Sequence, residues 1–215
     1  MSAAVSPKIN TDSLVLYYDF SNPKCYPGTG STVNSLTGNY SGTLSGSPAF
    51  SQSTGGNILM DGVDDFLQVV NVPLGASRTV EMVYSLLNPS TGWGPLYRTN
   101  DRVERIYPTN VTLINSTTTY YYLAGPQSNT NIISTCYSFS GTNAKCYRNG
   151  VLTDNQTMSA AMSTGTYNYR FGYQEGGASV AYINMRLYSV KFYDKQLTDD
   201  EVLRNYETVK GRFGY

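Results

Sequence analysis

Histidine is absent from this chain of 215 residues, and its absence narrows the chemistry that the protein could perform. Without imidazole there is no Ser-His-Asp or Cys-His triad, no histidine-ligated zinc and no imidazole general base. An enzyme built on this sequence would have to use carboxylates, lysine, tyrosine or an unpaired thiol. The acidic and aromatic side chains are therefore the groups best able to bind or transform a ligand.

Three aspartates, Asp61, Asp64 and Asp65, lie close together in the sequence and could supply hard oxygen ligands to calcium. The same residues have a structural alternative, because an Asp-Gly pair opens tight turns. Asp19 and Asn22 present the same two alternatives. We favour the structural role at both places, so no cofactor is expected, although calcium at the three aspartates stays open.

Aromatic rings are the second group of candidates, because an exposed ring can stack on the face of a sugar. Tyrosine fills 20 of the 215 positions, and Trp93 is the single tryptophan, in a glycine-flanked turn that would expose it. Tyr97, Tyr120 and Tyr122 could complete a glycan-binding platform with Trp93. The alternative is that strand alternation buries every second tyrosine and that Trp93 covers one end of the fold.

The three cysteines are an odd number, which rules out a complete disulfide framework. Cys136 and Cys146 flank a turn centred on Gly141, and a hairpin there would place them nearly opposite each other. We favour two buried thiols over a bond between them, and Cys25 has no obvious partner.

Charge and hydropathy exclude two classes of partner. Fifteen basic residues balance fifteen acidic ones, so the chain lacks the basic excess with which proteins neutralise nucleic-acid phosphates. No apolar run approaches the 18 or so residues of a membrane span, and residues 1–8 contain no apolar segment typical of a secretory signal. We expect neither nucleic-acid binding nor membrane insertion.

Short apolar segments separated by turn formers predict a mostly β protein. Residues 14–20 are apolar on both faces, which predicts a central strand. Residues 57–60 and 66–70 flank a turn at Asp61-Gly62 and predict a hairpin. Residues 79–87 alternate, which predicts a long strand with one buried face.

The C-terminal part adds a bulge and the one convincing helix. Along residues 181–193 the apolar phase changes, so we expect a β-bulge near Leu187–Ser189. Thr198 to Glu201 form a capping box, an apolar stripe follows, and Gly211 is expected to end the helix.

The predicted fold class is an all-β, jelly-roll β-sandwich of two antiparallel sheets with one short C-terminal helix. Residues 1–12 are predicted to be an irregular N-terminal arm, and residues 13–215 a single domain.

Four segments, in this order, resemble the laminin G-like members of the concanavalin A-like lectin/glucanase superfamily. They are residues 14–22, 60–67, 147–152 and 190–202, and the match extends over roughly residues 13–213. Its specific parts are the Asp-Gly-Val-Asp-Asp-Phe block and the tail that ends in Gly-Arg-Phe-Gly. The resemblance implies a jelly roll with a hairpin at the aspartates, whose side chains cap backbone amides. It selects no activity, because that superfamily includes lectins, glycosidases and adhesive modules.

A glycosidase needs two carboxylates about 5–9.5 Å apart across the scissile bond, and the resemblance implies alternate positions on one strand for them. Asp199 and Glu201 have that spacing but lie at the predicted helix start, where it diverges. Asp101 and Glu104 are three positions apart and Glu81 is alone on its strand. We therefore expect no catalytic residues and no enzymatic activity.

Closely similar stand-alone chains with the Gly-Arg-Phe-Gly ending look like structural proteins of tailed-phage virions. The resemblance implies a structural protein of the virion surface, assembled in the host cytoplasm, and the spacing of the acids adds that it is not an enzyme. Our first interpretation is a capsid decoration protein bound to other virion proteins such as the major capsid protein. The alternative is a tail- or fibre-associated lectin that binds cell-surface glycans. We expect the arm, which could become ordered only against a neighbouring subunit, or residues 212–215 to make the docking contact.

Overall fold

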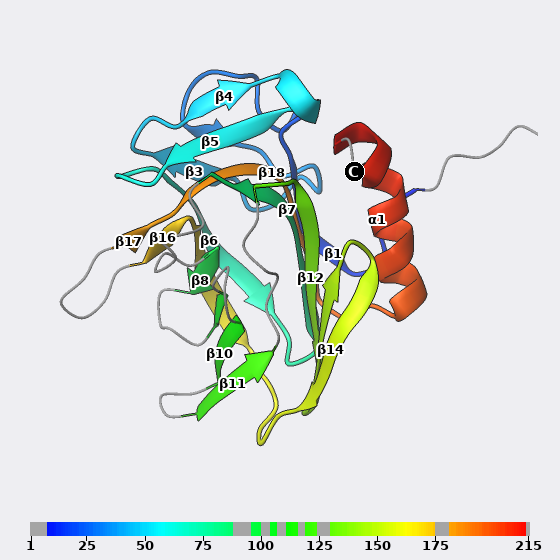
Figure 1. The fold of residues 1–215 in the computed structure, drawn as a ribbon. Helices are drawn as coiled ribbons and strands as arrows, with labels where there is room; N and C mark the ends of the chain where they lie inside the picture. The colour runs from blue at the N-terminus through cyan, green and yellow to red at the C-terminus, as the bar shows by residue number, and fades with distance from the viewer. Residues whose placement is uncertain are drawn as a thin grey trace, which may run out of the picture.

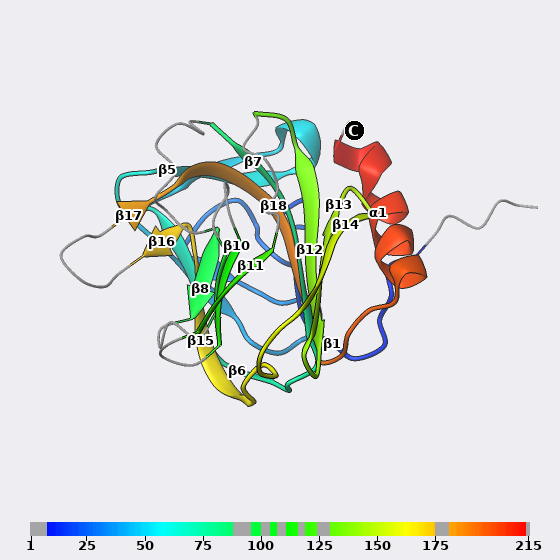
Figure 2. The ribbon, with the colours of Figure 1, turned by 60° about the horizontal axis from the view of Figure 1, so that its bottom comes forward.

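Two antiparallel sheets lie face to face in the computed structural model of the chain, and one helix lies outside the larger sheet (Figures 1 and 2). This arrangement confirms the predicted β-sandwich with a C-terminal helix. The structure describes residues 8–87, 96–99, 104–106, 111–115, 119–123, 130–174 and 181–213. Among these residues, no helix is both long and apolar enough to cross a membrane.

The larger sheet has eight strands. Seven of them run in the order β14 (Val151–Thr157), β13 (Asn143–Arg148), β12 (Ile133–Ser140), β7 (Arg78–Leu86), β18 (Asn184–Tyr193), β5 (Asn57–Asp61) and β4 (Ala49–Ser51). The eighth strand, β1 (Leu14–Asp19), pairs with the C-terminal half of β18. Because β18 is its one strand partner among the described residues, the prediction of a central strand at residues 14–20 is wrong.

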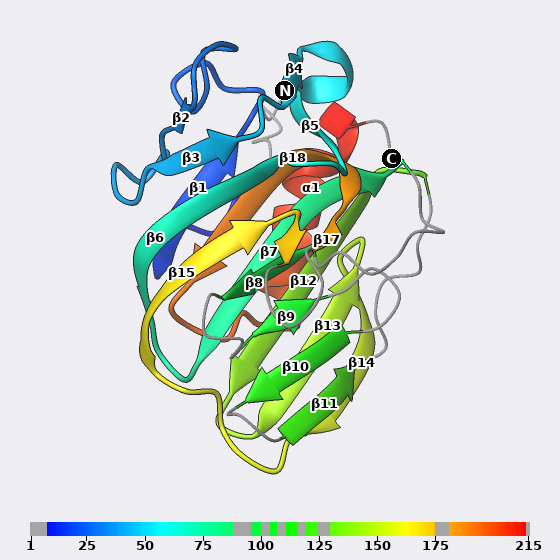
Figure 3. The same cartoon turned by 90° about the vertical axis from the view of Figure 1, so that its left-hand side faces the viewer.

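The second sheet has six strands and faces the viewer in Figure 3. Their order is β2 (Thr32–Val33), β3 (Gly42–Ser45), β6 (Phe66–Leu74), β15 (Gly165–Phe171), β8 (Tyr97–Thr99) and β9 (Arg105–Ile106). Two small ladders complete the strands, β10 (Val111–Asn115) with β11 (Thr119–Leu123), and β16 (Tyr173–Gln174) with β17 (Ala181–Tyr182). A short 3-10 turn, η1, covers Ser53–Gly55.

The core fills the space between the two sheets. Phe192 of β18 is fully buried and contacts Tyr169 and Phe171 of β15 across that space, with ring centroids 4.6 and 6.0 Å away. The period of two along each strand sends these rings inward and sends their sequence neighbours to the opposite face. Aromatic rings of this size bury large apolar areas, so the two sheets are held together largely by them.

Helix α1 (Asp199–Phe213) covers the outer face of the larger sheet, as Figure 2 shows. Val209 and Phe213 of the helix pack with Val83 of β7 and Tyr188 of β18. Every residue of β7 is consequently buried, so the expectation of a strand with only one buried face is wrong. The helix supplies the second apolar environment that the strand pattern alone could not reveal.

The expected hairpin at residues 57–70 is also wrong. Strand β5 pairs with β18 and β4 in the larger sheet, whereas β6 pairs with β3 and β15 in the second sheet. The intervening turn therefore carries the chain from one sheet to the other. Two apolar segments with a turn between them have the same sequence pattern in either case.

Several local signals are confirmed. The register of β18 against β7 shifts between Leu187 and Ser189, where the bulge was expected. The backbone amide of Thr198 donates to Glu201 Oε2 at 2.9 Å, and that of Glu201 donates to Thr198 Oγ1 at 3.3 Å, which completes the capping box. The helix, however, extends past Gly211 to Phe213, which is buried against the sheet.

The predicted hairpin around Gly141 exists, but its register separates the two cysteines. Cys136 lies opposite Tyr147, and Cys146 lies opposite Tyr137. A shift of one position sends the two side chains to opposite faces of the sheet. All three cysteines are buried and free, and burial raises the pKa of the Cys146 thiol to about 11.

The described part of the N-terminal segment is ordered against its own domain. The backbone amide of Asn10 donates to Asn205 Oδ1 at 2.7 Å, and Tyr193 Oη donates to the backbone carbonyl of Asn10 at 3.1 Å. Asp12 forms an ion pair with Lys195 at 2.6 Å. The expectation that residues 1–12 could become ordered only against another subunit is therefore wrong for this stretch. The contacts are polar, so the lack of a hydrophobic run in this segment did not prevent them.

Candidate binding sites

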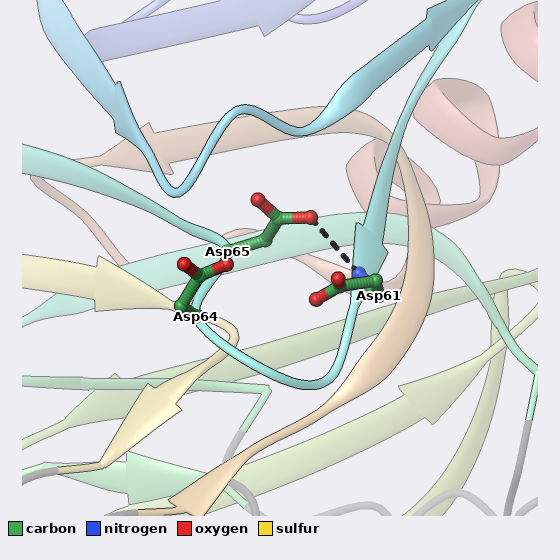
Figure 4. Close-up of side chains that lie close together, drawn as sticks. All are labelled: Asp61, Asp64 and Asp65. Carbon is green, nitrogen blue, oxygen red and sulfur yellow. Dashed lines mark hydrogen bonds between the residues drawn. The ribbon is translucent and has the colours of Figure 1, made fainter.

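The three aspartates of the crossover turn lie together, as Figure 4 shows. One carboxylate oxygen from each of Asp61, Asp64 and Asp65 lies within 4.8 Å of the others. Asp65 Oδ2 accepts the Asp61 amide at 3.1 Å, and Asp61 Oδ1 accepts the Val63 amide at 2.8 Å. Burial and the two neighbouring carboxylates raise the pKa of Asp65. The cluster has the oxygen ligands that calcium requires, but two of its three members already stabilise the turn.

Asp19 also has a structural role. Its Oδ1 accepts the amide and the hydroxyl of Ser21 at 3.1 and 2.7 Å, and its Oδ2 forms an ion pair with Arg212 at 2.7 Å. Because Arg212 is near the end of α1, this pair joins the first strand to the C-terminal helix. Residue Arg212, where the sequence suggested a docking tail, is thus used within the domain.

The structure places only one of the four proposed sugar-binding aromatic residues in full. Tyr97 lies in β8 with 0% of its surface exposed, and its hydroxyl donates to Glu104 in the interior. A buried ring has no face for a sugar, so Tyr97 belongs to the core alternative. Tyr120 and Tyr122 lie on β11, opposite Ile114 and Thr112, where only the backbone is described. Trp93 lies outside the described residues.

Two buried acids are neutralised by buried bases. Glu104 lies 3.0 Å from the Arg78 guanidinium, and both side chains have no exposed surface. Glu81 lies 3.2 Å from Lys191 Nζ, beneath helix α1, and both side chains are 1% exposed. Asn205 of the helix donates to the other oxygen of Glu81 at 2.7 Å. A buried charge is tolerated only with such partners, so these carboxylates are committed to pairs inside the fold and are closed to a ligand.

Two open grooves were not foreseen from the sequence. The larger, about 520 Å³, is formed where β1, the end of β6 and the start of β15 meet, beside the loop that contains Tyr40. The smaller, about 490 Å³, lies between the loop at residues 26–31 and the β3–β4 turn. The larger groove is lined by segments far apart in the sequence, from residue 14 to residue 194, which is why no linear motif marks it.

The chain matches no protein-family model and no curated protein. Its fold does resemble solved structures at low identity. Domain 4 of a GH43 extracellular arabinanase from Geobacillus stearothermophilus, in complex with arabinotriose, matches with TM-score 0.65 and 14% identity. That match covers 90% of this chain and 98% of the other.

Two longer proteins contain a similar fold. Trypanosoma rangeli sialidase matches with TM-score 0.70 and 10% identity, over 99% of this chain and 37% of the sialidase. The binding domain of botulinum neurotoxin DC, in complex with rat synaptotagmin II, matches with TM-score 0.66 and 11% identity. That match covers 92% of this chain and 52% of the other. The chain therefore spans only part of these two proteins, and the likeness concerns the fold.

Proposed function

We propose that this protein is a non-catalytic binding module whose ligand is a glycan. The observation that carries the proposal is the match with arabinanase domain 4, because it covers nearly the whole of both chains and that domain was solved with arabinotriose. A fold by itself does not determine a ligand, so the proposal also rests on the presence of open grooves in this structure.

The non-catalytic part of the proposal rests on the acids. Hydrolysis of a glycosidic bond requires two carboxylates on either side of a bound sugar. Of the described acids, Glu81 and Glu104 are buried in ion pairs. Asp61 and Asp65 accept hydrogen bonds from backbone amides. The cluster of Asp61, Asp64 and Asp65 lies before the first residue of β6, whereas the larger groove lies at the other end of that strand.

A glycan array with the purified protein tests the binding function, and incubation of each bound polysaccharide with the protein tests catalysis. We expect millimolar or tighter binding and no release of reducing ends. Turnover that disappears on replacement of a single carboxylate would overturn the non-catalytic assignment. The variant Trp93→Ala tests whether the tryptophan participates in binding, as the sequence suggested.

We further propose that the module is displayed on the surface of a tailed-phage virion, as a decoration protein on the major capsid protein or as a tail- or fibre-associated lectin. The sequence resemblance supports this location. Three exposed apolar side chains, Val151, Leu152 and Leu203 (63%, 39% and 42% exposed), support a protein contact. Leu203 lies over Gly150, where a side chain would come within 3.1 Å of it, so this helix residue is beside the turn that leads into Val151 and Leu152.

Binding to purified capsids tests the decoration role. We expect the variant Leu203→Ser to lower the amount of protein that sediments with capsids. The neighbouring exposed residue gives a matched control, Arg204→Ser, which should sediment as the wild type does. Equal sedimentation of both variants and the wild type would remove Leu203 from the docking surface. Absence of wild-type sedimentation would favour the tail or fibre alternative.

A further inference from the structure

The larger groove combines backbone strain with a mixed apolar and polar lining. Pro73 and Leu74 at the end of β6 and Leu14 at the start of β1 provide apolar surface. Thr166 of β15 and Asp194, just after β18, are exposed and provide polar groups. The groove's volume, about 520 Å³, lies within the range of about 300–1,000 Å³ typical of small-ligand sites.

Tyr40 is the aromatic residue of this lining, and its backbone is strained. Its φ is 57°, in the left-handed region that an aromatic residue rarely adopts. Tyr18, which is fully buried, donates its hydroxyl to the Tyr40 carbonyl at 2.5 Å. Strain of this kind persists where surrounding groups hold it and is concentrated at ligand sites. The core therefore fixes Tyr40, itself half-buried, at the edge of the groove.

Asp194 is held on the other side of the groove. Its Oδ1 accepts the Gly75 amide at 2.6 Å, and no described residue donates to its Oδ2. A side chain at position 75 would come within 2.8 Å of Oδ1, so glycine permits this close approach. An exposed carboxylate oxygen fixed in this way can accept hydrogen bonds from ligand hydroxyls, and the exposed Asn39 amide beside Tyr40 can both donate and accept.

We propose that this groove binds a neutral oligosaccharide, a site that deepens the proposed function and rests on it. An aromatic ring and a proline offer apolar surface to the C–H face of a sugar, while a carboxylate and an amide meet its hydroxyls. The described lining contains one carboxylate and no lysine or arginine, which disfavours an acidic sugar. The smaller groove has no charged lining residue, so it lacks the strong acceptor that the larger one has.

Direct titration of the intact chain with the neutral oligosaccharides that give the strongest array signals tests the site. The variant Thr166→Arg places a long side chain at an exposed lining position and should weaken binding at least tenfold. The control Thr43→Arg makes the same change at an exposed strand position of the same sheet outside the groove, and should bind as the wild type does. Asp194→Asn, which retains an acceptor for the Gly75 amide, should weaken binding several-fold.

The outcomes separate the site from the function. If wild-type protein binds no glycan on the array, the proposed function and the site both fail. If it binds but Thr166→Arg and Thr43→Arg bind equally well, the function stands and the site assignment is overturned. A selective loss in Ser31→Arg, an exposed position of the smaller groove, would assign the ligand to that groove instead. Preference for acidic over neutral saccharides would contradict the ligand class.

Discussion

The buried ion pair between Glu81 and Lys191 gives the sharpest test of how charge is accommodated beneath the helix. The two residues lie opposite each other on β7 and β18, and each oxygen of Glu81 has one partner, Lys191 at 3.2 Å and Asn205 of α1 at 2.7 Å. Glu81→Gln preserves the shape and one acceptor but removes the charge. An ammonium group that is 1% exposed then remains in the interior without its counter-ion.

The expected cost follows from that burial. Removal of one partner of a buried pair typically destabilises a protein by about 3–5 kcal/mol, because the other charge is left uncompensated. For a chain of this length, each kcal/mol of lost stability lowers the melting temperature by about 2–4 °C. The midpoint of thermal unfolding should therefore fall by roughly 6–20 °C. The second change Lys191→Met removes the stranded charge, and the double variant should therefore recover more than half of the loss.

Urea unfolding, followed by tyrosine fluorescence and circular dichroism, measures the differences in unfolding free energy. They are expected as shifts of the urea midpoint with an unchanged dependence of the free energy on urea concentration. The matched control is Glu207→Gln, because Glu207 pairs with Lys210 on the exposed face of α1, with side chains 38% and 42% exposed. An exposed pair contributes about 0–1 kcal/mol, so this variant should unfold close to the wild type. If Glu81→Gln loses no more stability than Glu207→Gln, the buried charge of Lys191 does not depend on Glu81 for its compensation.

Two further predictions concern pH and glycine. Hydrogen bonds from Lys145 and Tyr147 lower the pKa of Asp199, so the folded state binds fewer protons than the unfolded state, and the free energy of unfolding should fall as the pH drops below about 4. When the free energy of unfolding is measured in urea at a series of acidic pH values, it should fall less steeply with pH in Asp199→Asn than in the wild type. An equally steep fall in the variant would contradict this linkage. Gly56→Ala should destabilise by more than about 2 kcal/mol, because φ is 82° and a Cβ would lie 2.5 Å from a backbone oxygen. The control Gly38→Ala, at φ 85° with nothing within 4 Å, should lose only about 1 kcal/mol in the same urea assay, and equal losses would refute the steric argument.

Tertiary structure decided where each predicted element went. Two apolar segments on either side of a turn correctly located β5 and β6, yet the two strands join different sheets, because such a pattern leaves the partner strand open. Tyr97 shows the same limit for the candidate site. Its sequence context could not distinguish a displayed ring from a core ring bonded to Glu104, since burial between the two sheets depends on strands far away in the sequence.

The sequence by itself determined the features that depend on a few neighbouring residues. The Asn149-Gly150 turn has positive φ at both positions, 49° and 77°, and the Thr198–Glu201 capping box forms because its groups lie within one helical turn. The lack of histidine and the balanced charge also excluded whole classes of chemistry before any fold was known. By contrast, the groove beside Tyr40 joins residues 14, 40, 75 and 194, and only long-range burial brings these segments together. Local steric and hydrogen-bonding preferences act over a few residues, whereas the burial of apolar surface depends on every segment at once.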